Sequence, residues 1–213
     1  MIRTRSLLAL ALACLPALQD AAAQSPPARP TCDSPVVTEV VALDAPVQFN
    51  RLGAHYPAWM IYALREDVVA TGGGSALQPG RVRLRDGKRP RPLVLRVNAG
   101  ECLAIQFTNL LGPAEGDQPA TRTAGLHVMG LNYADRPQDG GSHVGRDASG
   151  QVPPGGSITY RLHAPEEGTF LFYNPAVTTG GEANTGSFAF GMFGAVNVQP
   201  PQSEWYRSQV SRA

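Results

Sequence analysis

A histidine and a methionine separated by one residue are the side chains of this 213-residue chain best placed to hold a metal ion. They form the triplet His127-Val128-Met129, and another histidine, His143, follows in the next loop. Residues i and i+2 of a strand share a face, so an imidazole and a thioether in this pattern can reach one ion. Thioether and imidazole donors suit Cu(I). The sequence therefore offers a candidate three-ligand copper site made of His127, Met129 and His143.

The same residues also permit a purely structural interpretation. His127 would then form a hydrogen bond within the fold, and Met129 would fill space in the core, as the flexible methionine side chain commonly does. His143 follows the run Asp139-Gly140-Gly141-Ser142, which is typical of a solvent-exposed turn. The sequence leaves both interpretations open.

Five short motifs follow one another in the second half of the chain, and their order is more specific than any one of them. They are Gly125-Leu126-His127-Val128-Met129-Gly130, Asp139-Gly140, Val152-Pro153-Pro154-Gly155, Glu167-Gly168-Thr169-Phe170-Leu171-Phe172-Tyr173-Asn174-Pro175 and Gly191-Met192-Phe193-Gly194-Ala195-Val196-Asn197-Val198. In this order the chain resembles the first cupredoxin (plastocyanin-like) domain of the multicopper oxidases. The resemblance is strong over residues 90–200 and weak over residues 36–90.

The ligand motifs depart from the pattern of that family. Its members have a His-x-His pair at the positions of His127 and Met129, and a second pair at the positions of Tyr173 and Pro175. One of the four expected imidazoles is therefore present. The mononuclear copper ligands of the family lie in its last domain, and Cys102 is a poor substitute because no histidine follows it.

The resemblance implies copper chemistry that this chain cannot complete alone. We expect an oxidoreductase-type domain with no catalytic residues of its own, which serves a structural or docking role beside further cupredoxin domains in cis or in trans. The alternative is a small module that binds one copper ion through His127, Met129 and His143. A third hypothesis is an active assembly in which other chains supply the missing imidazoles.

Short strands must position these residues. The sequence predicts strands over 36–47, 60–64, 92–97, 102–109, 157–162, 169–173 and 193–198, with alternation clearest in Leu103, Ile105 and Phe107. The 23 glycines and 19 prolines punctuate these runs, and no amphipathic helix is evident. This pattern predicts an all-β fold, a single Greek-key β-sandwich of the cupredoxin type.

The start of the chain has the pattern of a secretory signal peptide over residues 1–23. A basic start is followed by an apolar run too short to span a membrane, and Ala21-Ala22-Ala23 forms a small-residue cleavage site. We expect a flexible lead-in over 24–35, the cupredoxin-like domain over 36–199, and a tail or the start of an interdomain linker over 200–213. The expected location is secreted or periplasmic, without a membrane span.

Two cysteines remain once the predicted signal peptide is removed, and an exported protein meets an oxidising compartment. Cys32 and Cys102 are therefore a candidate disulfide, although sequence alone does not show that they approach each other. The formal net charge is only +1, so nucleic acid is not an expected partner. The local exception is an arginine-rich stretch over residues 81–91, for which Asp86-Gly87 predicts a solvated hairpin turn.

Overall fold

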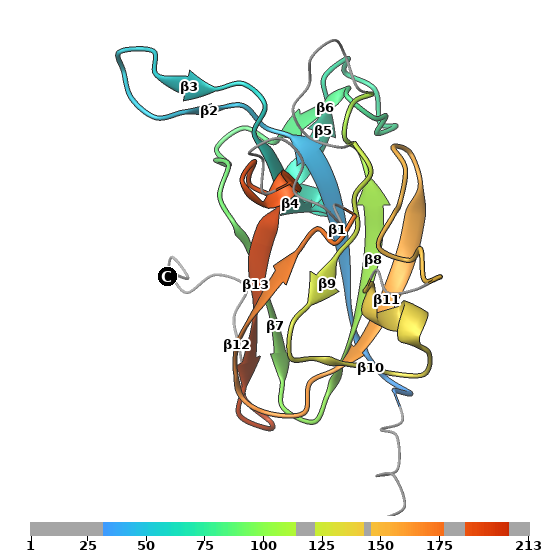
Figure 1. Ribbon diagram of the computed structural model, residues 1–213. Helices are drawn as coiled ribbons and strands as arrows, with labels where there is room; N and C mark the ends of the chain where they lie inside the picture. Colours follow the sequence, from blue (N-terminus) through green and yellow to red (C-terminus); the bar gives the residue numbers. More distant parts are fainter. Residues whose placement is uncertain (1–31, 114–121, 143–145, 177–185, 205–213) are drawn as a thin grey trace, which may run out of the picture.

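Two antiparallel-dominated sheets pack face to face in the computed structural model, which describes residues 32–113, 122–142, 146–176 and 186–204 (Figure 1). The five-stranded sheet has the order β10 (Asn132–Tyr133), β11 (Ser157–His163), β8 (Cys102–Asn109), β1 (Val36–Asp44) and β4 (Met60–Leu64). The four-stranded sheet has the order β7 (Leu93–Asn98), β13 (Phe193–Gln199), β12 (Gly168–Tyr173) and β9 (His127–Val128). The predicted all-β sandwich is confirmed.

Several short elements lie outside the two main sheets. The hairpin of β2 (Val47–Gln48) and β3 (His55–Tyr56) projects away from the sandwich, and β5 (Val68–Ala70) pairs with β6 (Val82–Leu84) at one end (Figure 1). Three short 3-10 helices are η1 (Arg65–Asp67), η2 (Pro137–Gly140) and η3 (Gly186–Phe188). No helix within the described ranges is long and apolar enough to cross a membrane. The predicted signal peptide lies outside those ranges.

The strands on either side of the turn at Gly100 belong to different sheets. β8 runs parallel to β1 and antiparallel to β11, whereas β7 runs parallel to β13. Gly100 has φ +85°, a left-handed conformation that glycine adopts at little cost, and its N–H donates to the carbonyl oxygen of Ala164. The chain therefore crosses from one layer to the other at this turn, which ties the two sheets together.

The predicted hairpin around Asp86-Gly87 is wrong. The turn itself forms, because the Lys88 amide donates to the Arg85 carbonyl oxygen and Gly87 has φ +85°. Its first arm, β6, pairs instead with β5, and residues 85–92 contain no strand. This arginine-rich segment has no alternating apolar face to bury against a partner, so it runs across the surface as a loop.

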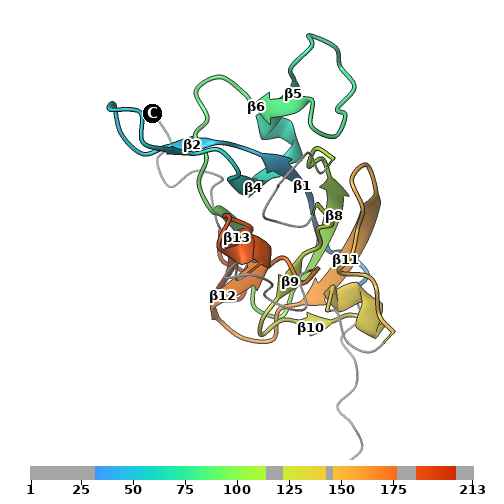
Figure 2. The ribbon, with the colours of Figure 1, turned by 45° about the horizontal axis from the view of Figure 1, so that its top comes forward.

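The main core fills the space between the sheets. Its largest fully buried side chains come from both layers and include Tyr62, Leu103, Ile105, Phe107, Leu126, Tyr160, Phe172 and Met192. A second, smaller cluster covers the outer face of β1 and β4, where β5 and β6 pack over it: Val41, Leu43, Ile61, Val68 and Val82 (Figure 2). The second half of β1, residues 40–43, is thus buried on both faces, which accounts for the continuous apolar run there.

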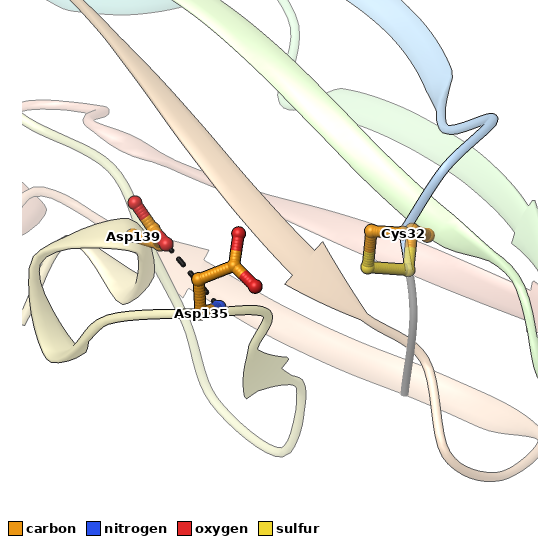
Figure 3. Close-up of a disulfide and its surroundings, with 4 residues drawn as sticks. Cys32, Asp135 and Asp139 are labelled. Carbon is orange, nitrogen blue, oxygen red and sulfur yellow. Dashed lines mark hydrogen bonds between the residues drawn. A yellow bond between two sulfur atoms is a disulfide. The ribbon is translucent and has the colours of Figure 1, made fainter. Parts of the chain in front are cut away.

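A disulfide between Cys32 and Cys102 fastens the segment before β1 to the first residue of β8, with Cα atoms 5.6 Å apart (Figure 3). Because β1 and β8 are adjacent parallel strands, the bond lies beside the start of their pairing, where Val36 is opposite Leu103. It links residues 70 positions apart in the sequence. A cross-link over such a loop restricts the unfolded chain more than the folded one.

We predict that Cys32→Ser lowers the free energy of unfolding by about 2–4 kcal/mol, because the unfolded chain regains loop entropy. Urea denaturation followed by tryptophan fluorescence, without reductant, measures the difference. The matched control is the wild-type chain in reductant, which should unfold at the same urea concentration as the variant. Equal free energies for the oxidised wild type and the variant would contradict the prediction.

Candidate functional site

The two positions that begin the ligand motifs meet across β9 and β12. The register places Tyr173 opposite His127, and Phe172 opposite Val128. Val128 and Phe172 are fully buried in the core, so His127 and Tyr173 point to the other side of the sheet and are half-buried. The two rings are edge to face, with centroids 5.7 Å apart and an interplanar angle of 86°. The fold therefore brings the first positions of the two motifs side by side.

The ring of His127 is oriented by a backbone carbonyl. Its Nδ1 lies 2.8 Å from the oxygen of Gly140, at the end of η2. A carbonyl oxygen only accepts, so Nδ1 carries the proton in this hydrogen bond. In the neutral ring the lone pair is then on Nε2, and this arrangement is common for metal-binding histidines. The geometry suits His127 to bind an ion through Nε2.

Met129 lies on the same side of the strand as His127 but is half exposed to solvent, at 52%. Its amide donates to the carbonyl oxygen of Leu171 at 2.9 Å, which extends the β9–β12 ladder by one residue. The interpretation that Met129 fills space in the core is wrong, because the inward position of this segment belongs to Val128. The thioether is thus accessible at the surface. The third candidate ligand, His143, lies outside the described residues.

The second motif is occupied by groups that hold the fold together. Asn174 is buried, and its Oδ1 accepts from the amides of Gly125 at 2.8 Å and Ala176 at 3.1 Å. Its Nδ2 donates to Ser187 Oγ at 2.7 Å. Pro175 is buried, and a Cβ added to Gly150 would lie 2.6 Å from its Cγ. Where the resembled family has two imidazoles, this chain has a phenol, a hydrogen-bonding amide and a packed pyrrolidine ring.

Three buried side chains hold the segment that leads into His127. Tyr62 of β4 donates its hydroxyl hydrogen to the carbonyl oxygen of Gly125. Tyr160 of β11 accepts from the amide of Leu126 at 3.3 Å and donates to the carbonyl oxygen of Ser149 at 2.8 Å. Asn174 accepts through its Oδ1 from the amide of Gly125. Neither tyrosine is identifiable from the sequence, because no motif distinguishes an anchoring tyrosine from any other core aromatic.

The loop after η2 packs unusually closely against the same segment. Gly141 has φ +66°, and a Cβ there would lie 2.0 Å from the carbonyl oxygen of Leu126. Only glycine therefore permits this approach, which also brings the Gly140 carbonyl to His127. Asp139 supports the turn by accepting from the Arg136 amide at 2.9 Å and from the Asp135 amide at 3.3 Å (Figure 3). The position of the His127 ring thus depends on the geometry of this loop.

Within the described ranges, no three His, Cys, Asp or Glu side chains gather in a way that could hold a metal ion. His55 lies on the projecting hairpin, where its Nδ1 is 2.9 Å from the Gly53 carbonyl oxygen. His163 ends β11 opposite Cys102. Neither is on β9 or β12, so His127 is the one imidazole that the described residues bring to the motif positions.

The chain is 26% identical over 140 residues to the iron transport multicopper oxidase fetC of Epichloe festucae (strain E2368), an alignment covering 59% of this chain and 20% of the relative. No protein-family model matches this chain. Among solved structures, a multicopper oxidase from Pseudomonas thermotolerans is 19% identical, with a TM-score of 0.46, and the match covers 82% of this chain and 32% of that one. A copper nitrite reductase from Nitrosomonas europaea is 16% identical, with a TM-score of 0.46, covering 79% and 43%.

The match to fetC confirms the resemblance to the multicopper oxidases that the motifs indicated. The chain spans about a fifth of the length of the curated relative that it matches. The similarity therefore concerns one cupredoxin-like domain.

We predict that Asn174→Ala lowers the free energy of unfolding by about 1–3 kcal/mol, because the buried amide of Gly125 loses its acceptor. Chemical denaturation measures the loss. The matched control is Thr169→Ala, which removes an exposed side-chain hydrogen bond to Asn197 and should change stability by less than about 0.5 kcal/mol. Similar losses in the two variants would refute the anchoring role of Asn174.

We also predict a loss of stability at alkaline pH. Burial raises the pKa of Tyr160, and the pKa of Tyr62 is raised by burial and then by the neighbouring Tyr160. Above about pH 10 the unfolded chain releases these protons while the folded chain retains them, so the stability present below pH 10 is lost as pH rises. Each tyrosine contributes up to about 1.4 kcal/mol per pH unit to this slope.

Urea titrations between about pH 9 and pH 11.5 test the alkaline slope. Tyr160→Phe should make the slope shallower, whatever it does to stability at neutral pH. Tyr133→Phe, at an exposed position on β10, is the control and should keep the wild-type slope. An unchanged slope in Tyr160→Phe would show that the buried hydroxyl does not govern the alkaline transition.

Proposed function

We propose that this chain is an exported cupredoxin-like domain that serves as a structural or docking part of a copper oxidoreductase, and that it has no oxidase activity alone. The observation that carries the proposal is the pairing of His127 with Tyr173 across β9 and β12. The fold brings the ligand positions of the resembled family together, but a single imidazole stands among them. The fold of the resembled family is present, but most of the imidazoles that would bind a copper cluster are not.

The residues present do not fit a three-copper cluster. Such a cluster uses borderline nitrogen ligands that serve copper in both oxidation states. Pro175 has no side-chain donor and is buried, and Met129 offers a thioether, which is a poor ligand for Cu(II). Tyr173 offers a phenol where the resembled family has an imidazole. No step of dioxygen reduction is therefore assigned to this chain.

Its partners would be further cupredoxin domains, in cis or in trans. The fetC relative is about five times as long as the matched segment, which supports a role beside other domains. The disulfide between Cys32 and Cys102 supports a secreted or periplasmic location, because such bonds persist in oxidising compartments. The signal-peptide pattern over residues 1–23 supports the same location.

A second function is favoured by the orientation of one ring. Because Nδ1 of His127 donates to Gly140, its Nε2 is available to bind Cu(I), together with the exposed thioether of Met129. His143, three positions after Gly140 in the sequence, would be the third ligand. These residues would form a small copper-binding module that holds one ion.

One experiment separates the two functions. The purified chain is loaded with Cu(I) or Cu(II), loose metal is removed, and copper stoichiometry and oxygen uptake with a phenolic substrate are measured. The structural role predicts no retained copper and no oxygen uptake from a folded chain. The binding module predicts one retained ion that is lost in His127→Ala.

His55→Ala is the matched control, because His55 also has its Nδ1 against a backbone carbonyl oxygen but lies on the projecting hairpin. It should retain whatever copper the wild type retains. Loss of copper in both variants would show binding that is not specific to β9. Oxygen uptake by the chain alone would contradict both functions.

A further inference from the structure

A groove of about 990 Å³ lies between the outer edge strands of the two sheets, on the side of the molecule away from His127. β4 ends the five-stranded sheet and β7 ends the four-stranded sheet, whereas His127 lies on β9 at the opposite end of the latter. The loop of residues 85–92, which connects β6 to β7, forms part of the lining. Figure 1 shows this loop running from β6 to β7 beside the sandwich.

The groove concentrates positive charge in a chain that is nearly neutral overall. Two acidic residues line it, against five cationic ones: Arg85, Lys88, Arg89, Arg91 and Arg96. The whole chain has a formal net charge of only +1. Positive side chains along a recess attract an anionic partner and speed its association.

Some of these cationic side chains make contacts that hold the loop in place, and others form no ion pair among the described residues. Lys88 forms an ion pair with Asp67 at 3.0 Å, and the Arg85 guanidinium donates to the Glu66 carbonyl oxygen. These contacts fix the start of the loop against η1. In the part of the chain that the structure describes, no ion pair engages Arg89, Arg91 or Arg96. The charge of these three arginines is available to a partner.

The rest of the lining favours an extended polypeptide as that partner. Residues 61–64 of β4 and Leu93, Val94 and Arg96 of β7 line the groove, and among the described strands none pairs with the outer edge of β4 or β7. A free edge offers backbone hydrogen bonds to an added strand. Val94 is 42% exposed, so apolar contact is available beside the arginines. A simple polyanion would pair with the arginines but would make no backbone hydrogen bonds to the strand edges and no apolar contact with Val94.

We propose that the groove between β4 and β7 binds an acidic, extended segment of a partner protein. Carboxylates of the segment would pair with Arg89 and Arg91, its alternate apolar side chains would contact Val94, and its backbone would align with a free strand edge. The proposal is independent of copper, because the groove and β9 lie at opposite ends of the four-stranded sheet. A partner bound here leaves His127 and Met129 uncovered.

The test uses the purified chain and a labelled peptide in which Glu and Val alternate, with binding measured by fluorescence anisotropy. We expect the wild type to bind this peptide, and not a peptide in which Lys and Val alternate. The double variant Arg89→Glu/Arg91→Glu should weaken binding by about tenfold or more. Arg51→Glu, an exposed charge reversal on the projecting hairpin, is the matched control and should bind like the wild type.

Two further measurements separate the possible occupants. Amide hydrogen exchange should slow along β4 or β7 when the Glu-Val peptide binds, because an added strand protects edge amides. Inorganic polyphosphate should compete only weakly for the groove. Polyphosphate binding tighter than the peptide, without slowed exchange, would overturn the proposal and indicate a general polyanion surface. Equal peptide affinity in Arg51→Glu and the double variant would overturn it as well.

Discussion

The buried peptide groups of Gly125 and Leu126 are the constraint on which the site depends. They lead into a strand of only two residues, which is too short to satisfy them through a regular ladder. Buried amide and carbonyl groups without partners are costly, so side chains must supply the hydrogen bonds. Tyr62 and Tyr160 come from the five-stranded sheet, and Asn174 follows a strand of the four-stranded sheet. The same contacts that satisfy this segment therefore join the two layers beside His127.

This anchoring explains how the scaffold persists without the ligands of the resembled family. The core is built from apolar side chains and from hydrogen bonds to the backbone, and none of these contacts requires a metal. Asn174 keeps its position between Tyr173 and Pro175 as the residue that binds Gly125. Of the two ligand positions that flank this anchor, Tyr173 faces away from the core, whereas Pro175 is buried and packs near Gly150.

The sequence predicted the parts of this structure that local patterns determine. Leu103, Ile105 and Phe107 share one face of β8 and are all buried, because that face covers the main core. The all-β sandwich followed from these signals and is confirmed by the two sheets.

Pairing across long distances could not be predicted in the same way. Nothing local distinguishes a strand that pairs with its neighbour from one that crosses to the other sheet, as at Gly100, and the expected hairpin at Asp86-Gly87 failed for this reason. Exposure of Met129 depends on Val128 taking the inward position, which is decided by the register with β12. The hydrogen bonds of the anchoring tyrosines could not be predicted either, since the partners of their hydroxyl groups are not close neighbours in the sequence.

The parallel pairing of β1 with β8 has a consequence for the order of folding during the proposed export. β1 enters the oxidising compartment early and can pair soon with β4, but its other edge waits until residues 102–109 have followed. Until then a strongly apolar strand presents an open edge, which is a template for pairing with other chains. The arrival of β8 closes that edge and delivers Cys102 to Cys32 in the same event. Formation of the disulfide therefore accompanies the pairing of β1 with β8.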